Sequence, residues 1–300
     1  MEGKRVSMRQ IARECGCSVA TVSYALNRSG QAKISSATRL RIIETAKRLN
    51  YSPSRTARSR PGRAAILVTA VPGGSVGRRL GLMDLAWELT EQLRQLNIPA
   101  AVLEIEDLAR EWRQVYAISP DILFILDGGS KPVARLDPPC VQPIVFVDSD
   151  NSDPLYYKIL PDYPSLMQHA AQLLGGPGPF LVTEAVRSAE LRTLMTRNLP
   201  PENVFINDGG SLAGFLNAHR GQKGVVVGDL LAVEVCRSFP ARDLAVISAL
   251  DRADLFPPDL TVIPIPNRTR AAAAVTVARD LLTLKYDPEG DTRVLLKPKP

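Results

Sequence analysis

The sequence predicts a small all-helical head followed by a larger α/β core built of doubly wound parallel sheets. Residues 6–26 and 35–49 space their apolar side chains as amphipathic helices do. From residue 63 onward, short apolar runs alternate with helical stretches, a pattern typical of parallel sheets covered by helices. Charge separates the same two parts. Residues 1–62 hold 13 Lys or Arg against three acids, a net +10, whereas the remaining 238 residues sum to −4.

The head begins with two short helices joined by a tight turn, and a third helix follows at Ser35–Leu49. Ser7 with Gln10 three residues later is a capping box, which starts the first helix. Gly16 can take the left-handed conformation that ends this helix, and Ser18 can cap the next one.

The second helix carries small or polar side chains on its outer face. Val19, Val22 and Leu26 are expected to point inward. A short helix with such a face, held across a glycine turn, is the shape that enters the major groove of DNA. The segment is periodic and capped, which favours phosphate neutralisation over a solvated basic tail. These features predict a helix-turn-helix with the following residues facing outward: Ala20, Thr21, Ser23, Tyr24 and Asn27.

Residues 52–62 predict either a hinge helix or a disordered basic linker, and both alternatives stay open on the residues alone. Ser52-Pro53 resembles a helix start, and Pro61-Gly62 ends any helix. Barely two turns lie between them, too few to be stable alone in water. The three arginines of this segment would suit a helix that folds on DNA: Arg55, Arg58 and Arg60.

The head resembles the lac-repressor (LacI/GalR) family of bacterial transcription regulators. The resemblance implies a repressor that binds a pseudo-palindromic double-stranded DNA operator as a homodimer. Its recognition helices would lie in adjacent major grooves and its paired hinge helices in the central minor groove. The matching segments cover about 55 residues: Val6–Ala12, Gly16–Ser23, Leu26–Asn27, Ile34–Arg39, Tyr51–Pro53 and Ala57–Ser59. The implied DNA-binding residues are Ser7, Ser18, Ala20, Thr21, Ser23, Tyr24, Asn27, Arg55, Arg58 and Arg60.

Two residues depart from the family pattern. Tyr24 stands where the family often has Arg or His, and it would read a base by one hydrogen bond or by packing on a thymine methyl. Arg60 stands where the family usually has a hinge leucine. A guanidinium favours a narrow, electronegative minor groove, so the hypothesis is weaker kinking and more electrostatic binding. The alternative is that Arg60 abolishes hinge insertion.

The remainder of the chain predicts two parallel-sheet subdomains. Seven apolar runs are suited to buried strands: Ala64–Ala70, Ala100–Ile105, Asp121–Leu126, Pro143–Val147, Phe180–Thr183, Gly224–Val227 and Leu244–Ala249. Helical stretches between them include Arg79–Leu96, Ser165–Leu174, Ser188–Asn198 and Asp229–Phe239.

The family resemblance extends more thinly over this core. Its landmarks are Pro120–Leu123, Pro143–Asp148, Gly228–Ala232 and Pro257–Val262. The resemblance implies a type I periplasmic-binding-protein-like core with a cleft between two subdomains. The head would be residues 1–51, the hinge 52–62 and the core 63–300. Subdomain 1 would take residues 63–161 and 265–285. Subdomain 2 would take 162–264 and 286–300, including a last strand at Arg293–Leu296.

Ligands of such sheets bind beyond the carboxyl ends of the strands. Candidate effector-binding residues in these loops are Ser75, Asp148, Asp150, Arg192, Asp229 and Asp251. The alternative for each is a helix cap or a surface ion pair. The polar ring of a sugar site is sparse, so two readings stay open: a compact pocket for a small effector, or a core that only dimerises. Induction and co-repression are both open.

Composition argues against other functions. No run of eighteen apolar residues or apolar signal core occurs, so we expect a cytoplasmic protein with no membrane partner. Four scattered cysteines and two histidines predict no metal site and no cofactor, with Cys15 a reduced core thiol. His169 and His219 lie beside no Ser or Cys motif, so we expect no enzyme. The more serious rival is a largely non-specific DNA-binding protein.

Overall fold

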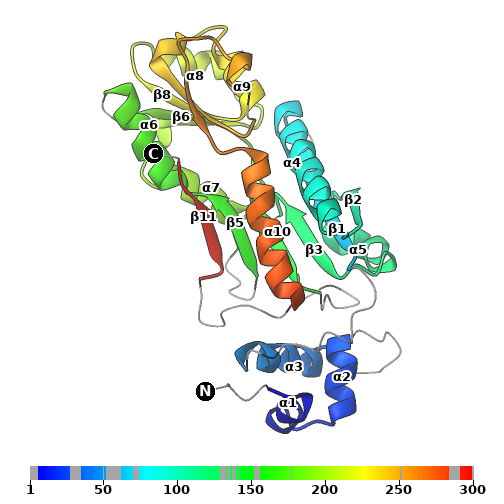
Figure 1. Ribbon diagram of the computed structural model, residues 1–300. Helices are drawn as coiled ribbons and strands as arrows, with labels where there is room; N and C mark the ends of the chain where they lie inside the picture. Colours follow the sequence, from blue (N-terminus) through cyan, green and yellow to red (C-terminus); the bar gives the residue numbers. More distant parts are fainter. Residues whose placement is uncertain are drawn as a thin grey trace.

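The computed structural model describes residues 6–27, 35–49, 51, 62–69, 74–128, 133, 136, 140, 142–151, 156–176, 178–250, 252–283 and 291–298. These residues form a three-helix head and a core of two parallel-sheet lobes (Figure 1). The predicted fold class is confirmed. No helix in these ranges is both long and apolar enough to cross a membrane.

The head consists of α1 (Met8–Glu14), α2 (Val19–Asn27) and α3 (Ser36–Arg48). The N–H of Gln10 donates to Ser7 Oγ at 3.3 Å, which is the predicted cap of α1. Gly16 has a φ of +59°, as predicted for the residue that ends this helix. The helices bury a small apolar core: Ile11, Ala12, Cys15, Val22, Ala25, Ile42, Ala46 and Tyr51.

The inward face of α2 differs from the prediction at one position. Val19 is 42% exposed, whereas Ala25 is buried. Val22, Ala25 and Leu26 follow the helical spacing i, i+3 and i+4 and make the packed stripe. Val19 is the first residue of the helix and lies beyond this packed part, so the prediction that it points inward is wrong.

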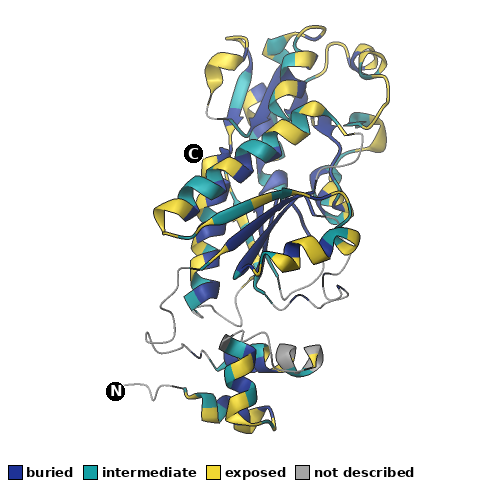
Figure 2. Ribbon diagram, turned by 90° about the vertical axis from the view of Figure 1, so that its right-hand side faces the viewer, coloured by how far each residue is buried: buried dark blue, intermediate teal, exposed yellow. Residues whose placement is uncertain are grey.

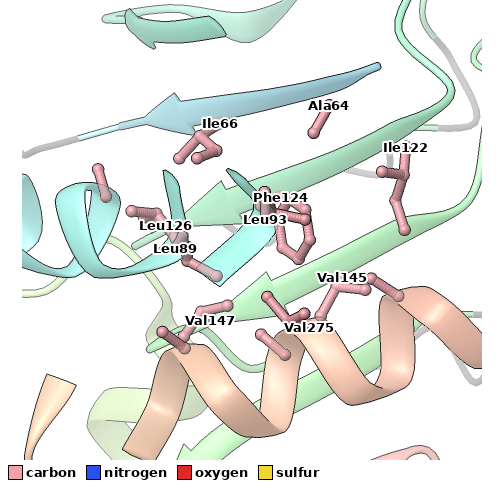
Figure 3. Close-up of a cluster of buried hydrophobic side chains, with 14 of the residues drawn as sticks. Ala64, Ile66, Leu89, Leu93, Ile122, Phe124, Leu126, Val145, Val147 and Val275 are labelled. Atoms are coloured by element: carbon pink, nitrogen blue, oxygen red, sulfur yellow. The ribbon is translucent and has the colours of Figure 1, made fainter. Parts of the chain in front are cut away.

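The first lobe is a six-stranded parallel sheet in the order β2-β1-β3-β4-β5-β11. Its strands are β1 (Ala64–Val68), β2 (Ala100–Glu104), β3 (Ile122–Leu126), β4 (Ile144–Val147), β5 (Tyr157–Pro161) and β11 (Arg293–Leu296). Helices α4 (Val76–Gln95) and α10 (Asn267–Thr283) cover one face, and α5 (Leu108–Ala117) covers the other. Figure 3 shows Leu89 and Leu93 of α4 and Val275 of α10 packed against the strands.

The second lobe is a five-stranded parallel sheet in the order β7-β6-β8-β9-β10. Its strands are β6 (Phe180–Glu184), β7 (Val204–Asn207), β8 (Gly224–Val227), β9 (Leu244–Ser248) and β10 (Thr261–Pro264). Helices α6 (Tyr163–Leu174) and α7 (Ala189–Thr196) cover one face, and α8 (Leu212–Ala218) and α9 (Asp229–Val235) cover the other. The strands are largely buried and the outer helix faces exposed (Figure 2).

The last strand belongs to the first lobe, which corrects the prediction that placed it in subdomain 2. The N–H of Lys158 donates to Thr292 O at 2.8 Å, and the N–H of Asp162 donates to Leu296 O at 2.8 Å. These bonds pair β11 with β5 in parallel register. The physical reason is that α10 packs on the six-stranded sheet, so the chain that follows it returns to the edge of that sheet.

Gly224, at the start of β8, accommodates a buried aromatic ring on the neighbouring strand. A Cβ at this position would lie 2.2 Å from Phe180 Cζ, and Phe180 is fully buried. We therefore expect Gly224→Ala to lower the free energy of unfolding by about 3 kcal/mol, as overpacking does. Urea unfolding measures the change. Gly178→Ala is the matched control, because its Cβ meets nothing within 4 Å; equal losses in both variants would contradict the steric explanation.

Candidate functional site

The outer face of α2 presents accessible side chains. Val19 and Tyr24 are 42% and 46% exposed, and Ala20 is exposed one turn before Tyr24. Ser18 Oγ accepts the N–H of Thr21 at 3.0 Å and lies 2.8 Å from Thr21 Oγ1, so both hydroxyls serve the start of the helix. Val19, Ala20 and Tyr24 therefore form an accessible face of α2, which would be the reading surface of a DNA-binding head.

The remaining predicted DNA-binding residues have varied positions. Ser7 is exposed and caps α1, Ser23 is half-buried on α2, and Asn27 is the last residue of α2. The three hinge arginines lie outside the described residues: Arg55, Arg58 and Arg60.

The head is held together by contacts between its first and third helices. Arg48 Nη2 lies 2.5 Å from Glu14 Oε2, and the thiol of Cys15 lies 3.7 Å from Arg41 O. Burial, with Cys15 beside it, raises the pKa of the Cys17 thiol in the turn, so this cysteine stays protonated at neutral pH. The helix-turn-helix is therefore a packed unit that presents α2.

A second cluster of polar residues lies where the strands of the first lobe end. Asp127 follows β3 and Asp148 follows β4, and both are buried with left-handed φ values of 55° and 52°. Aspartate is among the few residues that tolerate this conformation. The two carboxylates follow neighbouring strands and therefore come close together.

Two arginines hold these carboxylates. Arg78, in the first turn of α4, places Nη2 3.2 Å from Asp127 Oδ1 and Nη1 3.3 Å from Asp148 Oδ2. Arg270, in the first turn of α10, places Nη1 2.5 Å from the same Asp148 oxygen. Its Nε donates to Ile265 O at 3.2 Å. One buried network therefore connects α4, α10 and two strand ends.

Burial and charge act against each other in this network. Burial disfavours the charge of Arg78, but Asp127 and Asp148 outweigh it and raise the pKa of Arg78. Burial raises the pKa of the Asp127 carboxyl, against the attraction of Arg78. Burial, with Asp148 nearby, raises the pKa of Tyr163 to about 12. Arg78 is thus a permanent cation and Tyr163 a neutral phenol at physiological pH.

Asp150 belongs to the same region but has a different partner. Arg293 of β11 donates to both of its carboxylate oxygens, from Nε at 3.2 Å and from Nη2 at 3.0 Å. The backbone carbonyl of Asp150 accepts the hydroxyl of Ser188, from the second lobe, at 2.6 Å. Both predicted aspartates after β4 therefore contact arginines of the chain itself.

The other predicted effector-binding residues are separate from this network or only border it. Ser75 Oγ accepts the N–H of Arg78 at 3.1 Å and caps α4. Asp229 accepts from Ser248 Oγ at 2.5 Å and from the N–H of Ala249 at 3.1 Å, which ties α9 to the end of β9. Arg192 is exposed on α7 and donates to Val186 O at 3.2 Å. Asp251 lies outside the described residues.

Sequence reasoning missed four members of the network: Arg78, Asp127, Tyr163 and Arg270. A signal existed for Asp127, because it follows a fully buried apolar strand just as Asp148 does. The arginines carry no such signal, since each lies in the first turn of a helix where basic residues have no special preference. Within the described ranges, no three His, Cys, Asp or Glu side chains gather as metal ligands would.

Comparison with known proteins is consistent with this architecture. Residues 7–54 match the family model described as "Bacterial regulatory proteins, lacI family". The structure is similar to the lac repressor dimer bound to operator and the anti-inducer ONPF, with 17% identity, a TM-score of 0.60, and coverage of 98% of this chain and 97% of that one. It is similar to the CelR–cellobiose complex at 16% identity, with a TM-score of 0.60 and 98% of each chain covered. CcpA of Lactococcus lactis matches at 14% identity and a TM-score of 0.58, over 80% of this chain and 97% of that one. No protein with a curated description is similar enough in sequence to count as a relative.

A helix-turn-helix head joined to a core of two parallel-sheet lobes defines a class of DNA-binding transcription regulator. The head of this chain, over residues 7–54, matches the lacI family of bacterial regulatory proteins, and the whole chain has the fold of the lac repressor.

Proposed function

We propose that the protein is a sequence-specific repressor that binds a pseudo-palindromic DNA operator as a homodimer. The observation that carries this proposal is the exposed face of Val19, Ala20 and Tyr24 on the second helix of a packed, basic head. Short apolar side chains at this place suit thymine methyl groups, and a tyrosine hydroxyl suits one base edge. The protein would act in the bacterial cytoplasm, where the chromosome lies.

Selection of binding sites from random duplex DNA at near-physiological salt tests the proposal. We expect an enriched palindrome, because two copies related by a two-fold axis read two half-sites. No enrichment, with binding that collapses as salt rises, would mean that the head only neutralises phosphates. The protein would then be a non-specific DNA binder.

Tyr24 gives the sharpest residue-level prediction for the head. It is 46% exposed on α2 and is not part of the buried cluster of the head. We expect Tyr24→Ala to cost about 1–3 kcal/mol of binding to the selected site and to relax preference at one or two base positions. Titration of the selected duplex and of single-base variants measures both effects. An unchanged sequence preference would remove Tyr24 from the reading surface.

An exposed apolar stripe on α4 supports the homodimer. Val76, Leu80 and Trp87 are 71%, 54% and 71% exposed and, with the half-buried Met83, follow the spacing i, i+4, i+7 and i+11 on one side of the helix. The N-terminal end of the stripe lies next to α9, since a Cβ on Gly77 would lie 3.2 Å from Leu230 Cβ. Such a patch across both lobes is typical of an interface, and we assign it to a second copy of this chain.

We propose that a small effector alters DNA binding by changing the arrangement of the lobes. The strand-end aspartates Asp148 and Asp150 support this, since they lie where ligands of parallel sheets bind. The structures with ONPF and cellobiose show ligands of the similar proteins. Thermal-shift assays with sugars, nucleosides and amino acids test the idea. A second candidate, a core that only dimerises, is favoured by the pairing of both aspartates with arginines of the chain, and the absence of any stabilising compound would support it.

We further propose that the protein is not an enzyme. Of its two histidines, His219 is buried among Phe180 and Phe215, and its Nδ1 donates to Phe215 O at 2.8 Å. Its Nε2 lies 3.3 Å from Asn203 Oδ1. Both ring nitrogens of His219 are therefore engaged by polar groups of the second lobe, which suits a structural role.

A further inference from the structure

We infer that the loop Glu184–Ser188, which runs from the last residue of β6 to the N-cap of α7 in the second lobe, is a latch that holds the two lobes together. This inference deepens the proposed function, because it concerns how the core of the regulator fixes the arrangement of its lobes. Three observations carry it: three hydrogen bonds between the lobes, the close approach of the Glu184 carboxylate to the backbone of Gly77, and a connected chain of hydrogen bonds and ion pairs.

The three hydrogen bonds all run from donors in the second lobe to acceptors in the first. The N–H of Arg187 donates to Asp127 Oδ1 at 3.2 Å, and its Nη2 donates to Glu106 O at 2.6 Å. The hydroxyl of Ser188 donates to the carbonyl of Asp150 at 2.6 Å. Glu106 lies between β2 and α5, so the loop reaches two strand ends and the segment beyond a third strand of the first sheet.

Glu184 makes the close approach at the other end of the loop. Its side chain is 5% exposed, and a Cβ on Gly77 would lie 2.7 Å from its Oε1. Asn207 Nδ2 donates to its Oε2 at 3.0 Å and fixes the orientation of the carboxylate. Gly77 lies in the first turn of α4, where the helix dipole favours a negative charge. The second lobe thus places a buried carboxylate at the start of a helix of the first lobe.

The latch is also connected to the crossover between the lobes. A chain of contacts runs from Ile265 O through Arg270, Asp148, Arg78 and Asp127 to the N–H of Arg187. Ile265 directly follows β10 of the second lobe, so the chain begins and ends in that lobe and passes through the strand ends of the first. Opening the lobes would break the contact between Arg187 and Asp127 at one end, whereas the contact between Arg270 and Ile265 lies within the crossover itself.

All of these contacts are made by groups of the protein itself. An effector that favours one lobe arrangement would act by shifting the balance between latched and open forms.

Hydrogen exchange of the full-length protein, measured by mass spectrometry without DNA, tests the latch. We expect slow exchange in the peptide that contains residues 184–191. Arg187→Ala removes the bond from Nη2 to Glu106 O but keeps the N–H that donates to Asp127. This peptide and the one that contains Glu106 should therefore exchange roughly 3- to 10-fold faster, the effect of losing one such hydrogen bond. Arg220→Ala is the matched control, since Arg220 is an exposed arginine of the same lobe whose Nε donates to Asn217 Oδ1, three residues away on the same side of the lobe boundary.

A second pair of variants on α4 tests the latch from the opposite lobe. Gly77→Ala displaces the Glu184 carboxylate and should speed exchange in the same two peptides, whereas Gly81→Ala meets nothing within 4 Å and should not. Unchanged exchange in both Arg187→Ala and Gly77→Ala, or exchange in wild-type residues 184–191 as fast as in an open loop, would overturn the inference. Because no DNA is present, the result is independent of whether site selection finds an operator.

Discussion

Replacing Arg78 by methionine is expected to lower the free energy of unfolding by about 3–5 kcal/mol, the cost of leaving a buried charge without its partner. Methionine fills similar space, but Asp127 keeps only the N–H of Arg187, while Asp148 keeps Arg270. Both carboxylates are buried, at 0% and 2% exposure, so water cannot replace the guanidinium. Urea unfolding at pH 7 measures the loss.

The loss should depend on pH in a definite direction. Burial raises the pKa of Asp127, and removing Arg78 takes away the interaction that opposes this rise. A carboxyl whose folded pKa exceeds its unfolded value favours the folded state below the unfolded pKa, and this contribution is lost as pH rises through the folded pKa. Arg78→Met should therefore be closer to wild type in stability at pH 5 than at pH 7.

Arg79→Met is the matched control for Arg78→Met. Arg79 is the next residue on α4 and pairs with Glu104 at 2.8 Å, but the two side chains are 59% and 41% exposed. An exposed pair of this kind contributes about 0–1 kcal/mol. Adding Asp127→Asn to Arg78→Met should recover part of the loss, because a neutral amide can be buried more easily. Equal destabilisation by the two arginine variants would contradict the buried network.

The elements predicted most closely are those with complete burial. β1, β3 and β9 are buried at every position and appear as continuous apolar runs in the sequence. The prediction did not include β5, β7 and β10. β7 and β10 are four-residue edge strands of the second sheet, and β5 has Lys158 as its second residue. Short or polar strands lack the apolar run from which a buried strand is predicted.

The candidate site likewise has local features, which the sequence predicts, and long-range contacts, which it does not. The caps of α1 and α2 and the glycine turn between them are local, and the sequence predicts them because each is decided within three residues. The network of charged residues at the strand ends of the first lobe is not local: Asp148 meets partners 70 and 122 residues away, and Asp150 meets Arg293 across 143 residues. Spacing in the chain contains no information about such pairs until the fold is known.

Trp87→Glu is expected to convert the proposed dimer to a monomer and to weaken binding to the selected operator on the order of a hundredfold or more, as the second head loses its link to the first. Trp87 is 71% exposed at the C-terminal end of the α4 stripe and lies outside the buried clusters, so a glutamate there should leave the protomer folded. Sedimentation equilibrium measures the association, and titration of the operator measures affinity.

Leu173→Glu separates this effect from a general effect of added negative charge. Leu173 is 52% exposed on α6 of the second lobe, away from the α4 stripe, and its replacement should leave both dimer and operator affinity unchanged. A Trp87→Glu protein that stays dimeric would place the interface elsewhere. A monomer that still binds the full operator as tightly as wild type would refute the two-headed mode of recognition, since one head contacts only one half-site. The two readouts together therefore distinguish an error about the interface from an error about how the protein reads DNA.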